Sequence, residues 1–115
     1  MRDSTVLQQV GKVVLVPIHG PVTTELFDQL RSELLAHLKR AGARGVVLDL
    51  SGVEVMDADD FANLRRVVET ASLMGASVVV AEMQPGVAGA IVLLDADTSW
   101  IRTARTVERA MRAVT

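Results

Sequence analysis

The chain has 115 residues, half of them hydrophobic, which is sufficient for one domain with its own core. Its formal net charge of −2 and its dispersed Lys and Arg residues argue against nucleic acid as a partner. The absence of Cys excludes disulfides and thiol catalysis, and no apolar run approaches the roughly 20 residues of a membrane span. We therefore expect a single cytoplasmic domain, residues 1–115, that contacts neither nucleic acid nor membrane.

Two short segments rich in β-branched residues predict a hairpin at the start of the domain. Thr5–Val10 and Val13–Ile18 have the composition of strands, and Gly11-Lys12 between them predicts a tight turn. Gly20-Pro21 is expected to end the second strand, because proline has no backbone N–H to donate.

The first helix is predicted from apolar residues that recur every three or four positions. Thr23 can cap its first turn, and Gly42 provides a C-terminal stop. The apolar stripe consists of Leu26, Phe27, Leu30, Leu34, Leu38 and Ala41.

The domain is expected to be organised around the stretch Gly45–Asp60, GVVLDLSGVEVMDADD. Gly45–Leu50 is almost continuously apolar, which predicts a strand covered on both faces at the centre of a sheet. Ser51-Gly52 is expected to break this strand. Three apolar residues of the following loop are expected to return to the core, namely Val53, Val55 and Met56.

Asp57 occupies the predicted N-cap of a second helix, and Ala58, Asp59 and Asp60 fill its first turn. Unpaired backbone N–H groups and the helix dipole both favour carboxylates at this position. The spacing of Asp57 and Asp60 also fits a capping box, which we favour over a metal or ligand role for either residue.

The second helix is predicted to have an apolar and a polar face, and to end at Gly75. Arg65 is spaced to pair with Glu69. The apolar face consists of Phe61, Leu64, Val67, Val68 and Ala71. The polar face consists of Asp59, Asp60, Asn63, Arg66, Glu69 and Thr70.

The last third of the chain predicts two further strands and two further helices. Ser77–Ala81 reads as a buried strand, and Val87–Leu94 as a helix that is apolar almost all round, so it should be buried or face a partner. Trp100-Ile101 is expected to form a brief edge strand, and Thr103 to cap a last helix. The inner face of that helix would hold Val107, Ala110, Met111 and Val114.

The element order is thus β-β-α-β-α-β-α-β-α, which predicts an α/β domain with a mixed, mostly parallel sheet. The first three helices are expected to pack against this sheet, because their apolar faces are too extensive to stand alone.

Three motifs of the chain, in their order and spacing, resemble the STAS domain family of anti-sigma-factor antagonists, and within it the small stressosome scaffold of RsbS type. They are DLSGVEVMDADDFANL around the second helix start, LMGA at 73–76 followed by SVVVA, and QPGVA at 84–88. The likeness extends from about Val6 to Met111.

The resemblance implies a domain without catalytic activity or cofactor that acts by binding. Its expected partners are a switch serine/threonine protein kinase, sister STAS-domain proteins, and further copies of itself in a homodimer or larger assembly. In the family motif a Ser or Thr follows the Asp, and a partner kinase phosphorylates that hydroxyl. Here the Asp corresponds to Asp57 and the phosphoacceptor slot to Ala58, which has no hydroxyl. The expected contact residues are Ser51, Asp57, Asp59, Asp60, Asn63 and Arg66.

Other functional classes provide two alternatives. Asp49, at the end of the central strand, stands where a receiver domain has its phosphorylated aspartate, although the acid pair and the Lys of such a site are missing. The second alternative is a sensor that binds a small molecule between the second strand and the third helix. Ser51 is a further candidate acceptor, but a turn role is favoured. No metal site and no catalytic residue is predicted.

Overall fold

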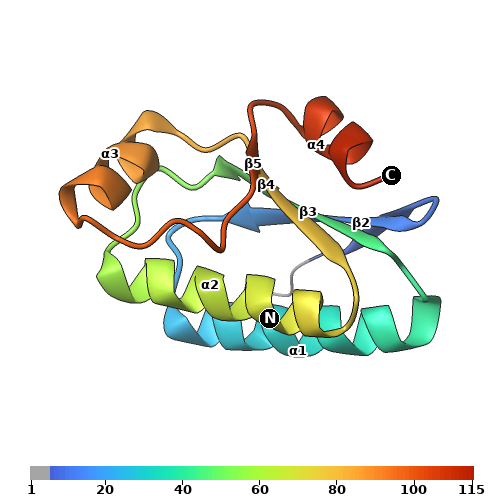
Figure 1. The fold of residues 1–115 in the computed structure, drawn as a ribbon. Helices are drawn as coiled ribbons and strands as arrows, with labels where there is room; N and C mark the ends of the chain where they lie inside the picture. The colour runs from blue at the N-terminus through green and yellow to red at the C-terminus, as the bar shows by residue number, and fades with distance from the viewer. Residues whose placement is uncertain (1–5) are drawn as a thin grey trace.

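The computed structural model describes residues 6–115, and Figure 1 shows their path. A five-stranded sheet with the order β1-β2-β3-β4-β5 forms the centre of the domain. β1 (Gln8–Val10) pairs with β2 (Val13–His19) antiparallel, whereas β3 (Gly45–Gly52), β4 (Ser77–Ala81) and β5 (Thr103–Ala104) run parallel to β2. The predicted α/β class, element order and mixed, mostly parallel sheet are therefore confirmed.

The four helices cover the sheet unequally (Figure 1). α1 (Thr24–Ala41) and α2 (Ala58–Leu73) lie side by side on one face, and α4 (Val107–Ala113) lies on the other. α3 (Pro85–Leu93) was expected against the sheet as well, but it lies beyond the carboxyl ends of the strands. Its buried residues, Val87 and Ile91, are one turn apart and reach the core from the end of the sheet.

Side chains of the central strand alternate between two apolar layers. Val46 and Leu48 of β3 belong to the layer under α1 and α2, whereas Val47 belongs to the layer under α4. All three residues are fully buried, because β3 lies between β2 and β4 and both of its faces are covered. The predicted central strand is thus confirmed, and its carboxyl end leads into the start of α2.

Some boundaries differ from the prediction. β3 continues through Ser51-Gly52, because the Gly20 N–H donates to the Gly52 carbonyl at 2.8 Å and extends the pairing with β2. β1 begins at Gln8, so Val6 and Leu7 of the predicted strand lie outside it, and Thr5 lies outside the described residues. Ala41 was expected on the buried stripe of α1, but as the last helical residue it is exposed.

The last strand and the last cap lie three residues later than predicted. Thr103–Ala104, rather than Trp100-Ile101, pairs with β4, and Thr106 caps α4. The expected cap, Thr103, is therefore part of β5. Trp100 instead packs its half-buried ring on α2 from a loop, which satisfies its apolar character without strand pairing. The inner face of α4 is as predicted, with Val107, Ala110, Met111 and Val114 against the sheet.

Candidate docking surface at the start of α2

Two carboxylates hold the first turn of α2. Asp57 Oδ1 accepts a hydrogen bond from Asp60 N at 2.8 Å, and Asp60 Oδ2 accepts one from Asp57 N at 3.0 Å. This reciprocal pair is the predicted capping box, which satisfies two backbone N–H groups of the helix start. Burial raises the pKa of Asp60, the hydrogen bond from Asp57 N opposes that rise, and the charges of Asp57 and Asp59 add to it.

Ala58 is the first residue of α2, and its methyl group is exposed between acidic neighbours. Glu54, Asp57 and Asp59 are also exposed, and Asp60 is half-buried. Within residues 6–115 no ion pair joins any of these four carboxylates to a Lys or Arg. The start of α2 is therefore an open surface whose carboxylates have no ion-pair partner among the described residues.

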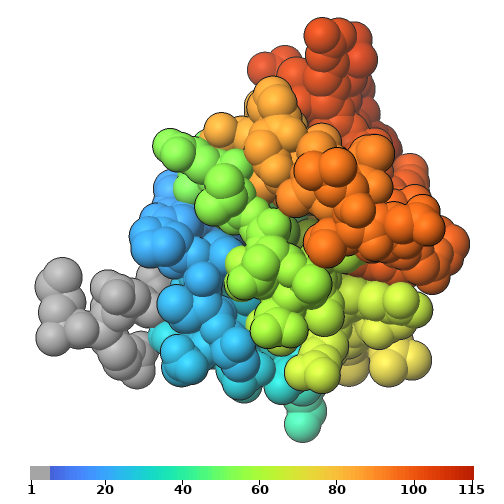
Figure 2. Space-filling view, turned by 90° about the vertical axis from the view of Figure 1, so that its left-hand side faces the viewer, coloured from blue at the N-terminus to red at the C-terminus, as the bar shows by residue number. Residues whose placement is uncertain are grey.

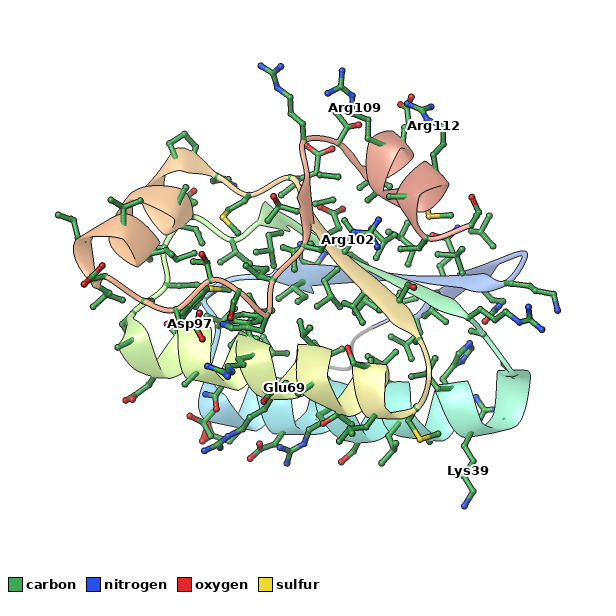
Figure 3. All side chains as sticks on the ribbon, in the orientation of Figure 1. Lys39, Glu69, Asp97, Arg102, Arg109 and Arg112 are labelled. Carbon is green, nitrogen blue, oxygen red and sulfur yellow. The ribbon has the colours of Figure 1, made fainter. Side chains whose placement is uncertain are left out.

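Arg65 of α2 forms ion pairs with carboxylates away from the start of the helix. Its Nε lies 3.3 Å from Glu69 Oε2, as predicted, and its Nη1 lies 3.7 Å from Asp97 Oδ2, which links α2 to the loop after α3. Figure 3 labels Glu69 and Asp97. Hydrogen bonding from Ser99 to its carboxylate lowers the pKa of Asp97, and the nearby Arg65 contributes to the same effect.

Several segments meet at this end of the molecule, which faces the viewer in Figure 2. Gln84 Nε2 donates to the Ser51 carbonyl at 2.5 Å and so ties the start of α3 to the end of β3. Gly86 approaches the loop after β3 so closely that a Cβ there would collide with the Glu54 carbonyl oxygen and would lie 3.8 Å from Val55 Cγ1. The loop, α2 and α3 thus form one continuous surface.

Two residues have the opposite exposure to the one predicted. Asn63, expected on the exposed face of α2, is only 7% exposed, because α1 packs alongside and Asn63 Nδ2 donates to Thr24 Oγ1 at 3.3 Å. Val55, expected in the core, is 72% exposed beside α3, whereas Val53 and Met56 are buried as predicted. Asn63 is therefore unavailable as an exposed contact, and Val55 takes a place on the surface.

The far end of α3 adds an exposed apolar region. Val92 and Leu93 are 78% and 88% exposed, and Leu94 follows them at 46%. Apolar side chains that remain this open are typical of interaction surfaces. The sequence indicated this property only for the helix as a whole, through its lack of a polar face.

The predicted residues that remain to be placed are Ser51, Arg66 and Asp49. Ser51 and Arg66 are exposed, and Ser51 N donates to Asp49 Oδ1 at 2.9 Å, so Asp49 supports the turn that follows the central strand. In the described part of the chain no group of three or more His, Cys, Asp or Glu side chains is placed to hold a metal ion.

A cavity of about 260 Å³ lies between α3 and β5, not between β2 and α3 as the small-molecule alternative expected. It is lined by Met83, Ala88, Ile91, Thr98, Ile101 and Thr103. None of the helices within residues 6–115 has the length and apolar character needed to cross a membrane.

The chain is similar to known regulatory proteins. The RsbT co-antagonist protein RsbRA of Bacillus subtilis strain 168 is 26% identical over 100 residues, which cover 87% of this chain and 36% of RsbRA. The chain thus spans about a third of the length of that relative.

Two solved structures share its fold. A serine-to-glutamate variant of RsbS from Moorella thermoacetica superposes with a TM-score of 0.80 at 23% identity, covering 96% of this chain and 93% of that one. A chain from the stressosome, described as a signal integration and transduction hub, has a TM-score of 0.78 at 23% identity and 95% coverage of both chains.

The sequence profile of the STAS domain matches residues 4–110, nearly the whole chain. It covers all three motifs on which the predicted resemblance was based. The chain therefore belongs to the STAS domain family.

Proposed function

We propose that this STAS domain is a non-enzymatic regulatory module that docks a switch serine/threonine protein kinase, or a sister STAS-domain protein, at the start of α2. Membership of the family and the similarity to a co-antagonist support a regulatory role in protein interaction. The observation that carries the proposal is the exposure of Ala58 among carboxylates that form no ion pair within residues 6–115.

The docking surface would combine a charged rim with apolar contacts. Its charged and polar rim consists of Ser51, Asp57, Asp59, Asp60 and Arg66, all exposed or half-buried. Asn63 is excluded from the rim because it is buried. Val55 and the exposed end of α3 supply apolar side chains next to this rim, and interfaces commonly surround such an apolar centre with polar residues.

Ala58 would keep this surface in one charge state. A phosphate carries about −1.5 to −2 charges at neutral pH, so at this position it would gain from the helix N-terminus but face repulsion from the neighbouring carboxylates. A hydroxyl here would therefore make the surface switchable, whereas the methyl group of Ala58 makes partner binding constitutive.

Incubation with a switch serine kinase and ATP tests this function. The wild-type chain should co-elute with the kinase on size exclusion and yield no phosphopeptide over Met56–Phe61. Ala58→Ser should gain a phosphate at that position, because it restores the hydroxyl on the same exposed turn. A phosphopeptide over Met56–Phe61 from the wild-type chain, or binding that survives reversal of the Asp59 charge, would contradict the proposed surface.

A further inference from the structure

α4 carries a row of arginines on the side facing away from the sheet. Arg109 and Arg112 are three residues apart and therefore neighbours on the helix surface, and Arg105 immediately precedes the capping residue. All three are exposed, and Figure 3 shows Arg109 and Arg112 directed away from the sheet. We call Arg105, Arg109 and Arg112 the arginine row.

The arginine row has no carboxylate partner among the described residues. No ion pair within residues 6–115 involves it, and this includes Glu108, the one acidic residue of α4, whose carboxylate oxygens are not within 4.0 Å of a guanidinium nitrogen of the row. Arg102 is used differently, since its Nη2 donates to the Ala113 carbonyl at 3.2 Å. The row is thus a set of exposed cations available to an anionic partner.

Charge is divided unequally along this chain. Residues 98–115 contain four Arg and one Glu, a formal charge of +3, whereas residues 1–97 contain eight Lys and Arg against thirteen Asp and Glu, a formal charge of −5. The basic residues looked dispersed in the sequence, and that interpretation fails for the last segment. The turn of the helix brings Arg109 and Arg112 together on one surface.

The complementary surface lies on the other side of the sheet. The acidic end, defined as Glu54, Asp57, Asp59 and Asp60, surrounds the start of α2 and also lacks ion pairs within the described residues. α2 and α4 cover opposite faces of the sheet (Figure 1), so one molecule cannot bring its arginine row onto its own acidic end.

We propose that the arginine row of one copy docks on the acidic end of a second copy. The two surfaces differ, so the contact is head-to-tail, and each pair retains one free row and one free acidic end for further copies. Exposed charge pairs are individually weak and are screened by salt, so the association should depend on concentration and ionic strength. The arginine row lies outside the surface proposed for the kinase, whereas the acidic end belongs to it. The inference therefore rests in part on the proposed function and names a second copy as a partner of that surface.

Sedimentation velocity of the full chain tests this contact. At about 10 mM salt the Debye length is about 30 Å, and at about 1 M it is about 3 Å. The sedimentation coefficient of the wild-type chain should rise with concentration at low salt and stay at the monomer value at high salt. Reversing the row with Arg109→Glu and Arg112→Glu should raise the apparent dissociation constant at least about tenfold.

A second variant reverses the other partner surface. Glu54→Lys with Asp59→Lys changes the acidic end and leaves the Asp57–Asp60 capping box in place. This variant alone should also stay monomeric. An equimolar mixture of the two reversed variants should associate, because each chain then meets a surface of opposite charge on the other.

Lys39→Glu with Arg40→Glu is the matched control. It changes the net charge as much as the row reversal does. Both residues lie in the last turn of α1, on the opposite side of the sheet from α4. It should associate like the wild type. The proposal is overturned if the wild-type chain is monomeric at low salt, if the row reversal associates normally, or if the mixture stays monomeric. Binding of a monomeric wild type to anionic vesicles through the row would likewise overturn it.

Discussion

Asp57 and Asp60 exchange hydrogen bonds in both directions across the first turn of α2, at 2.8 and 3.0 Å. Both carboxylates therefore have a structural role, whereas Ala58 and Asp59 between them are exposed, and the side chain of Asp59 makes no hydrogen bond in the described structure. Substitutions of Asp57 or Asp60 should therefore change stability, whereas substitutions of Ala58 or Asp59 should change partner binding.

Asp57→Ala should lower the free energy of unfolding by about 1 to 2 kcal/mol, because it removes the N-cap acceptor and the capping box with it. Asp57→Ser keeps an acceptor oxygen and should recover most of that loss. Urea denaturation followed by circular dichroism measures both. The control Asp59→Ala should stay within about 0.5 kcal/mol of the wild type, and an equal loss there would show that the cap is not the cause.

The titration of Asp60 should make stability depend on pH. Because its pKa is raised above 3.8, the native state holds the proton more tightly than the unfolded chain does. Stability attributable to this group therefore falls as the pH rises from the unfolded value through the raised native value. Asp60→Asn removes the titration and retains an oxygen that can accept from Asp57 N.

The stability of Asp60→Asn relative to the wild type should thus increase as the pH rises through that window. Urea unfolding of both proteins over a series of acidic to neutral buffers measures the difference. A difference that is constant with pH, or that has the opposite slope, would mean that another group dominates the titration.

Two glycines of α3 should respond oppositely to alanine. Gly86→Ala places a methyl group against the Glu54 carbonyl and should cost about 1 to 3 kcal/mol, as overpacking does elsewhere. Gly89 has open space at the same position, so Gly89→Ala should stabilise the domain by about 0.5 to 1 kcal/mol through helix propensity. Thermal unfolding of the pair measures the difference, and equal effects would refute the close approach of α3 to the loop.

Leu93→Ser should weaken partner binding without changing stability. Leu93 is 88% exposed, so its removal opens no cavity, and the free energy of unfolding should change by no more than about 0.5 kcal/mol. Kinase co-elution and urea denaturation together measure the two quantities. Val87→Ser is the opposing control, since Val87 is fully buried and its substitution should unfold or strongly destabilise the domain. Unchanged kinase binding in Leu93→Ser would remove α3 from the docking surface.

Local chemistry made much of the structure predictable. Thr23 accepts the hydrogen bond that caps α1, and Gly42 ends it with a left-handed φ of 65°, as each residue type favours. Asp57 and Asp60 form the box that their spacing indicated, and the apolar run of β3 lies at the sheet centre. These features depend on interactions within about one helical turn, or on the burial of a single strand.

The sequence by itself therefore determined the order of the elements, the caps of the first two helices and the exposed alanine among acids. Tertiary packing decided the rest. Asn63 is buried because α1 lies beside α2. Val55 is exposed because α3 lies beyond the end of the sheet. The position of β5 is set by its parallel pairing with the edge of β4. Contacts between segments far apart in the chain create these outcomes, and the periodicity of one segment carries no information about which neighbour will cover it.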